Sequence, residues 1–221
     1  SKEEIGVIGI DVNVNHIACV ETDRHGNPIQ ERVFPWNTYG KTSEQAKAIT
    51  GDVCREIIDW AEKEKKPLVI ENLDFRKKKS QLSSQKEKQA RMLSSFSYGT
   101  FRTFLQARAY RCGIAVHTVN PAYTSVIGRC KFATRYGLST HLAAALCIGR
   151  RYQGFSERPN SHEGNIPDGK GLHVAFILPV RNRMKHVWSF WAEVRKKILT
   201  VLAAHFQTIL HRSLSPHLST T

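Results

Sequence analysis

The sequence lacks the features that mark several common protein classes. Its five cysteines form no Cys-x-x-Cys pair, so no zinc ribbon is expected, and an odd, scattered set is typical of reduced thiols. No stretch reaches the roughly 18 consecutive apolar residues that a membrane span needs. The residues ahead of the first apolar run show no signal-peptide pattern. We therefore expect a cytoplasmic chain with no membrane-spanning segment.

Acidic residues are few relative to basic ones. The 221 residues include 33 Lys and Arg against 19 Asp and Glu, a formal net charge of +14. Such an excess says little about the fold, but it indicates a polyanionic partner, either nucleic acid or an anionic membrane surface. The length is sufficient for one α/β domain with a substantial core and an appendage.

Much of the positive charge is concentrated in residues 76–91, RKKKSQLSSQKEKQAR, which hold seven basic residues and one Glu. A solvated loop or an exposed helix is the commoner outcome for such a run. The alternative is an arm that follows phosphates, which we favour because of the overall charge and because the arm follows Glu71 closely. The candidate nucleic-acid-binding residues are Arg76, Lys77, Lys78, Lys79, Lys86, Lys88 and Arg91.

Apolar patterning and turn signals predict alternating strands and helices. Strands are expected at residues 5–12, 16–22, 29–35, 68–71 and 114–118. Helices are expected from a cap at Thr42 or Ser43 to about residue 65, at 94–111, and from a cap at Ser139 through residue 148. Beyond residue 153 we expect a loop at 154–170, a possible strand at 172–180 and a long helix at 185–210.

Two of the expected strands end in a carboxylate. The apolar run of residues 5–10 leads into Asp11, and Pro67-Leu68-Val69-Ile70 leads into Glu71. A carboxylate at the end of a buried strand is costly to desolvate unless a basic side chain or a metal ion lies beside it. Two such strands that deliver carboxylates to one edge of a sheet can build a divalent-metal site.

Each candidate also has a structural interpretation. Asp11 could cap a turn or pair with an arginine, and Glu71 could pair with the basic arm. Asp74 is a rival carboxylate that fits a turn better. His141, in the first turn of the helix capped by Ser139, is a candidate third ligand, although a lone histidine at a helix start is usually structural.

The element order β-β-β-α-β-α-β-α is that of the ribonuclease H-like fold. We therefore predict an α/β protein with a mixed five-stranded sheet, three antiparallel strands followed by parallel ones, flanked by helices and with a C-terminal helical extension. Residues 1–152 would form this core, and residues 153–221 an extension packed on it. In this fold strands one and four are neighbours, so their carboxyl ends lie side by side.

Four segments resemble the RuvC-like nuclease domain of TnpB-type proteins, the OrfB transposases of bacterial insertion sequences, relatives of the type V CRISPR effector nucleases. They are GIDVN around Asp11, IENLDFRKKK around Glu71, VNPAYTSVIGRC from Val119, and LSTHLAAALCIGRR at residues 138–151. The resemblance covers most of residues 5–152. It implies a RuvC/ribonuclease H-like fold and Mg²⁺-dependent cleavage of DNA guided by an RNA, in a bacterial cytoplasm, with Asp11 and Glu71 as the first two catalytic acids.

The sequence departs from this family in three places. The third catalytic position, usually Asp, matches His141, and an imidazole ligand favours Mn²⁺ over Mg²⁺. Of the family's four-cysteine ribbon only Cys130 remains. Only ten residues precede Asp11, and the first is Ser, so we expect the nuclease half of a longer protein without most of the guide-binding region.

Our first hypothesis is a divalent-metal-dependent DNA endonuclease in which Asp11, Glu71 and His141 hold Mg²⁺ or Mn²⁺. The alternative is a catalytically weakened ribonuclease H-like module that binds nucleic acid. A junction resolvase of the same fold is a third possibility, and the sequence does not indicate an oligomeric state.

Overall fold

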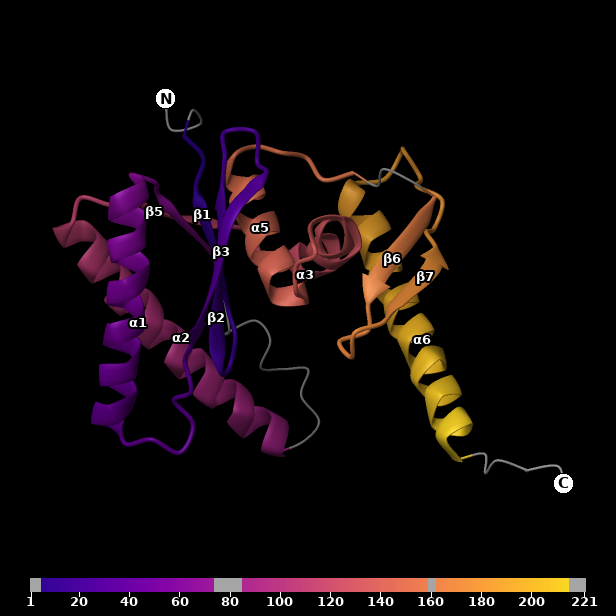
Figure 1. The fold of residues 1–221 in the computed structure, drawn as a ribbon, viewed down its shortest axis with the longest axis horizontal. Helices are drawn as coiled ribbons and strands as arrows, with labels where there is room; N and C mark the ends of the chain where they lie inside the picture. The colour runs from indigo at the N-terminus through magenta and orange to yellow at the C-terminus, as the bar shows by residue number, and fades with distance from the viewer. Residues whose placement is uncertain (1–4, 74–84, 159–161, 215–221) are drawn as a thin grey trace, which may run out of the picture.

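A five-stranded mixed sheet forms the centre of the computed structural model, which describes residues 5–73, 85–158 and 162–214 (Figure 1). The strands are β1 (Ile8–Val12), β2 (His16–Thr22), β3 (Pro28–Pro35), β4 (Leu68–Glu71) and β5 (Val116–Val119). Their order is β3-β2-β1-β4-β5, with β1, β2 and β3 antiparallel and with β4 and β5 parallel to β1. This confirms the predicted ribonuclease H-like fold.

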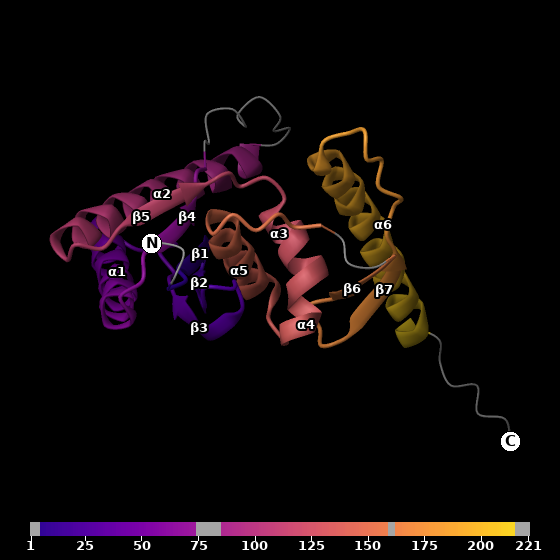
Figure 2. The same ribbon diagram turned by 90° about the horizontal axis from the view of Figure 1, so that it is seen from above.

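Helices cover both faces of the sheet. The long helices α1 (Ser43–Glu64) and α2 (Gln85–Arg111) lie on one face, and α5 (Thr140–Tyr152) lies on the other. The short α3 (Thr124–Gly128) packs against α5 on the side away from the sheet (Figure 2). The side chains between the sheet and α1 and α2 form one apolar cluster, which includes Ile10 and Ile70. Consequently the alternate residues of β1 and β4 point to the α5 face.

Local capping signals place two of these helices where the sequence predicted them. Thr42 accepts a hydrogen bond from the Gln45 backbone N–H, and the Gln45 side chain accepts one from the Thr42 N–H, a capping box at the start of α1. Lys65 ends α1 in the left-handed conformation. The hydroxyl of Ser139 accepts a hydrogen bond from the Leu142 N–H and caps α5.

Helix α5 packs on the sheet at unusually short range. A Cβ atom at Gly9 would lie 2.1 Å from the carbonyl oxygen of Ala145, so only glycine fits at this position. Gly149 makes the same kind of approach from the helix side, because its Cβ would lie 3.1 Å from a methyl of Val7. The first turn of α5 is thereby held close to the end of β1.

The N-terminal strands and α2 differ in length from their predictions. Strand β1 begins at Ile8, not at residue 5, because Gly6 has a positive φ of 81° that breaks the extended backbone. Helix α2 begins at Gln85, not at residue 94, so residues 85–91 of the basic arm are helical. The remainder of the arm, residues 76–84, lies outside the described residues.

Residues 124–136, for which no element was predicted, and part of the predicted loop at 154–170 are structured. Residues 124–136 contain α3, a π-helical turn (Arg129–Ala133) and α4 (Thr134–Tyr136), and they bury Ile127 and Phe132. Within 154–170, Glu163–Pro167 forms β6, which pairs with β7 (His173–Ile177) in a second, two-stranded sheet. The Gly, Asn and Pro content predicted a loop, but pairing with β7 and burial of Ile166 override this local preference.

The C-terminal extension packs on α5 through α6 (Val187–Leu214) and the β6–β7 hairpin. Phe190, Trp191 and Val194 of α6 share an apolar cluster with Leu146 of α5 and with Phe176 of β7. At the edge of this cluster the buried Glu157 pairs with Lys131 at 2.7 Å and with Arg150 at 2.6 Å. Across the described ranges, no helix combines the length and the apolar character that a membrane crossing requires.

The contact between β1 and α5 can be tested with two glycine substitutions. Gly9→Ala forces a methyl against the Ala145 carbonyl and is expected to lower the free energy of unfolding by about 3 kcal/mol. Gly51→Ala is the control, because no described atom lies within 4 Å of a Cβ there, and it is expected to raise stability by about 0.5–1 kcal/mol. Urea unfolding measures both, and a Gly9→Ala variant as stable as the parent would contradict the close packing.

Candidate active site at the carboxyl ends of β1 and β4

The parallel pairing of β1 and β4 sets two carboxylates side by side. The register of the two strands ends with Ile10 opposite Ile70, and Asp11 and Glu71 are the next residue on each strand. Both alternate with residues of the α1 and α2 cluster, and therefore both belong to the face that α5 covers. The structure brings the two predicted acids to one corner of the sheet.

His141 completes this corner from the first turn of α5. Its Nδ1 lies 3.2 Å from Asp11 Oδ2, and the amide of Asn13 donates to the same oxygen at 3.0 Å. Asp11 is 8% exposed as a residue, whereas the His141 side chain is 47% exposed. When Nδ1 carries the proton that Asp11 accepts, the lone pair of the imidazole lies on Nε2.

A second histidine at this corner was not predicted as a site residue. The ring centroids of His16 and His141 are 4.7 Å apart in an edge-to-face arrangement, and His16 Nδ1 lies 2.7 Å from Asn15 Oδ1. Burial and the neighbouring His141 lower the pKa of His16, while the charge of Asp11 acts to raise it. The turn between β1 and β2 folds His16 back beside Asp11, and its two asparagines were the only signal of this in the sequence.

Glu71 is oriented by two hydroxyl groups. The buried Thr124, at the start of α3, donates its hydroxyl hydrogen bond to Glu71 Oε1, and the Tyr98 hydroxyl donates to the Glu71 carbonyl. Burial raises the pKa of Tyr98 to about 12, so its phenol stays protonated and able to donate. Neither hydroxyl was identified as a site residue from the sequence.

The turn before α3 explains how Thr124 reaches Glu71. Asn120 Oδ1 accepts a hydrogen bond from the Ala122 N–H, which closes a turn around Pro121. Tyr123 then adopts a left-handed conformation with φ of 60°, which is uncommon for a residue other than glycine. This places the Asn-Pro-Ala-Tyr-Thr motif beside the second carboxylate of the site.

The donor atoms suit a divalent cation, although they do not yet form a complete cluster. Asp11 Oδ1 has no hydrogen bond within the described part of the chain, and carboxylate oxygens with one imidazole nitrogen are ligands of Mg²⁺ and Mn²⁺. Adjacent carboxylates repel each other when both are ionised, and a cation between them removes this cost. Among the described residues, no group of three His, Cys, Asp or Glu side chains is arranged closely enough to hold a metal ion.

The predicted phosphate-binding arm is not placed against this corner. Arg76, Lys77, Lys78 and Lys79 lie outside the described residues. The backbone of α2 includes the positions of Lys86, Lys88 and Arg91, but their side chains are not described. The role of these seven basic residues stays a prediction.

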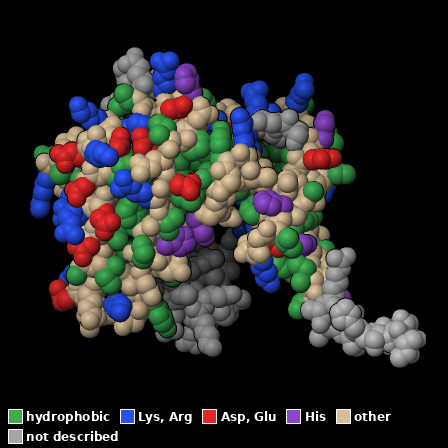
Figure 3. All heavy atoms as spheres, in the orientation of Figure 1, with side chains coloured by type: hydrophobic (Ala, Val, Ile, Leu, Met, Phe, Trp, Pro, Cys, Tyr) green, Lys and Arg blue, Asp and Glu red, His purple; other side chains and the backbone are tan. Residues whose placement is uncertain are grey.

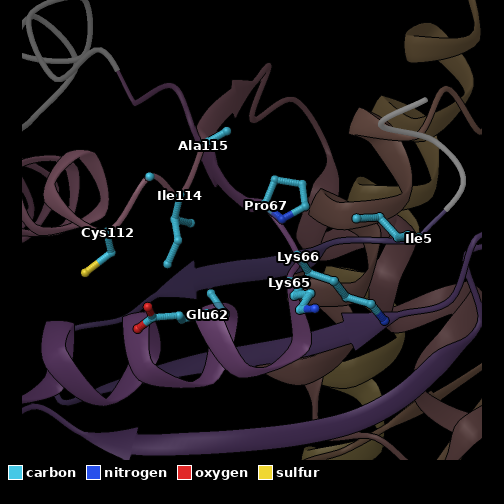
Figure 4. Close-up of a pocket in the computed structure, with 10 residues that line it drawn as sticks. Ile5, Glu62, Lys65, Lys66, Pro67, Cys112, Ile114 and Ala115 are labelled. Carbon is cyan, nitrogen blue, oxygen red and sulfur yellow. The ribbon is translucent and has the colours of Figure 1, made fainter.

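A hollow of about 360 Å³ lies at the opposite end of the sheet and is separate from this site (Figure 4). The connections from α1 to β4 and from α2 to β5 line it, with Lys65, Lys66 and Cys112 among its residues. The ammonium of Lys66 is held by Glu21 Oε1 at 2.6 Å and by the Thr22 carbonyl at 2.8 Å. The Lys66 ammonium is therefore used in an internal ion pair.

No protein-family model matches the chain, and no curated protein matches it. Its fold is similar to several solved structures. RuvC of T. thermophilus in complex with a Holliday junction substrate is 18% identical, with a TM-score of 0.44 over 66% of this chain and 90% of that one. A Cas12f1–sgRNA–target DNA complex is 16% identical, with a TM-score of 0.45 over 66% of this chain and 50% of that one.

The yeast mitochondrial Holliday junction resolvase Ydc2 is 13% identical, with a TM-score of 0.42 over 68% of this chain and 80% of that one. At these identities and TM-scores the likeness concerns the fold and is no sign of a shared activity. The functional conclusion therefore depends on the residues of this chain.

The proximity of Asp11, His141 and His16 can be tested without a metal ion. His141→Ala removes a positive neighbour and some of the burial, so the pKa of His16 is expected to rise. Asp11→Asn removes a negative neighbour, so the pKa of His16 is expected to fall. NMR titration of the His16 ring protons measures both shifts, and His25→Ala is the control because His25 is a surface histidine away from this corner. If the pKa of His16 were the same in both variants as in the parent, the three side chains would not be close together.

Proposed function

We propose that this chain is a divalent-metal-dependent nuclease domain that cleaves DNA phosphodiester bonds at the carboxyl ends of β1 and β4. The observation that carries the proposal is the placement of Asp11 and Glu71 directly after the paired Ile10 and Ile70 of neighbouring parallel strands, with His141 in contact with Asp11. Rigid strand ends hold oxygen ligands in fixed positions, which is the main task of a protein in metal-assisted hydrolysis.

Each residue at this corner would have a distinct role. Asp11 Oδ1 and the carboxylate of Glu71 would hold the cations, and His141 Nε2 would supply a third ligand while Asp11 Oδ2 orients the ring. A bound divalent cation activates water and stabilises the leaving oxygen of a phosphodiester. Asn13 donates a neutral hydrogen bond to Asp11, and the Thr124 hydroxyl donates one to Glu71, so both carboxylates have a side-chain partner that orients them.

The finer assignment is to a TnpB-type, RNA-guided nuclease. It is supported by the four segments that resemble this family, and the Asn-Pro-Ala-Tyr-Thr turn, whose Thr124 contacts Glu71, belongs to the most specific of them. The formal charge of +14 fits contact with both a DNA target and a guide RNA. In this assignment the domain acts as part of a longer bacterial protein.

A second candidate is a nucleic-acid-binding module without catalysis. It is favoured by the contact between His141 and Asp11, which gives the imidazole and the carboxylate a partner in each other without a metal ion, and by the incomplete ligand cluster among the described residues. Such a module would bind DNA or RNA in a salt-dependent way and would bind no divalent cation at this corner.

Loss of Asp11 separates these candidates. Asp11→Ala is expected to lower Mn²⁺- or Mg²⁺-dependent DNA cleavage by roughly 1,000-fold or more, as removal of an essential catalytic group does, while the fold remains. Asp52→Ala is the control, because the exposed Asp52 lies on α1 and forms its ion pair with Arg55 on the same helix. Cleavage by Asp11→Ala at the rate of the parent would overturn the assignment.

Calorimetry with Mn²⁺ distinguishes the nuclease from the non-catalytic module without a cleavage assay. The nuclease is expected to bind Mn²⁺ with heat that disappears in Glu71→Ala but persists in Asp52→Ala. If the parent binds no Mn²⁺ while it still binds DNA, the non-catalytic module is the correct function.

The Thr124 hydroxyl tests how Glu71 is held. Thr124→Val keeps the buried volume but removes the donor to Glu71 Oε1, and it is expected to weaken Mn²⁺ binding by about tenfold, as removal of a partner behind a metal ligand does. Thr124→Ser keeps the hydroxyl and is expected to bind nearly as the parent does. Calorimetry compares the variants, and equal affinity of Thr124→Val and the parent would exclude this role.

A further inference from the structure

A basic loop between β7 and α6 has no role in the proposed active site. We call residues 180–186, VRNRMKH, together with Trp188 in the first turn of α6, the β7–α6 loop. Arg181, Arg183 and Lys185 are its three cations, it contains no acid, and none of the three forms an ion pair with a carboxylate of the described residues. Figure 1 places this loop on the extension, at the amino end of α6, and Figure 3 shows Lys and Arg side chains there.

The backbone of the loop is fixed by its own hydrogen bonds. Asn182 Oδ1 accepts from the Met184 N–H at 2.9 Å, and the Asn182 carbonyl accepts from the Lys185 N–H at 3.2 Å. His186 caps α6, because its Nδ1 accepts from the Trp188 N–H and its carbonyl accepts from Ser189. The side chains are therefore presented from an ordered turn, which lowers the entropy cost of binding a partner.

Apolar and aromatic side chains alternate with the cations. Val180 and Met184 are 91% and 94% exposed. Trp188 is 38% exposed and meets the His186 ring edge-to-face at 5.1 Å, whereas the chain's other three tryptophans are at most 2% exposed. Cations together with an exposed aromatic ring are the combination by which proteins bind phosphates and stack on the bases of single strands.

We propose that the β7–α6 loop binds an unpaired strand of nucleic acid, with Arg183 and Lys185 on the phosphates and Trp188 stacked on a base. The bases of a duplex are already stacked, so a lone exposed indole selects a single strand. This inference rests on the proposed function only in taking nucleic acid as the partner. The loop lies on the extension, apart from the strand ends that carry Asp11 and Glu71, so it is a second contact surface.

The exposure of Trp188 allows oligonucleotide binding to be measured by tryptophan fluorescence. Because the other tryptophans are buried, quenching of the intrinsic fluorescence by a thymidine dodecamer in EDTA is expected to come from Trp188. Trp188→Phe is expected to abolish the quenching yet keep binding, measured by anisotropy of a labelled oligonucleotide. Trp188→Ala is expected to weaken binding by roughly tenfold. A uridine dodecamer is expected to behave in the same way, since the contacts are to bases and phosphates.

The cations are tested by the salt dependence of binding. Arg183→Ala with Lys185→Ala is expected to reduce the slope of log Kd against log salt by about 1.4, for two single-strand phosphate contacts. Lys41→Ala with Lys63→Ala is the control, because it removes the same charge from exposed positions at the two ends of α1. Its slope is expected to equal that of the parent.

Three results would overturn the proposal. They are quenching that persists in Trp188→Phe, a slope for the loop variant equal to that of the control, and quenching by a blunt duplex or by anionic phospholipid vesicles but not by the single strands. Because the assays use EDTA, they do not depend on cleavage. If the loop substitutions do not change oligonucleotide binding, the loop proposal is wrong but the nuclease proposal still stands. If the cleavage assay fails, the loop proposal still stands.

Discussion

The close contact between α5 and β1 is the constraint on which the rest of the structure depends. No side chain separates Gly9 from the Ala145 carbonyl, so the helix axis lies nearer to the sheet than ordinary side chains permit. This short distance determines how close the first turn of α5 lies to the end of β1. His141 reaches Asp11 directly, rather than through a water or a longer side chain, because the helix lies this close to the strand.

The same geometry explains how a strongly basic chain keeps a negatively charged corner. A Lys or Arg beside Asp11 would stabilise it but would also cancel its charge. At Asp11 the described partners are an asparagine amide and an imidazole, and a threonine hydroxyl is one partner of Glu71. Such donors lower the cost of burying a carboxylate while leaving most of its charge for a cation. The ammonium of Lys66, at the opposite end of the sheet, is paired with Glu21.

Much of this arrangement could be predicted from the sequence because its signals are local. The apolar strands that end in Asp11 and Glu71, and the caps at Thr42 and Ser139, are visible residue by residue. The element order then implied that strands one and four are neighbours, which the parallel pairing of Ile10 with Ile70 confirms. What could not be predicted depends on contacts between distant segments. His16, Tyr98 and Thr124 gain their roles only when a turn, α2 and α3 are packed against the strand ends.

The structure of the C-terminal extension also depends on contacts between distant segments, and its position relative to the core matters for function. Strand β6 forms in a segment of loop-like composition because it pairs with β7 and packs against the π-helical turn. Glu157 then ties this unit to the core through Lys131 of the π-helical turn and Arg150 of α5, and its carbonyl accepts from the indole of Trp191. Burying two ion pairs gains little net stability, but it selects one arrangement over others, because a shift of either partner leaves a buried charge unpaired. A nucleic acid that contacts both the extension and the carboxylate corner would therefore meet two surfaces held at a fixed separation. Such a separation favours a strand long enough to span both, which is an argument for recognition by geometry as well as by charge.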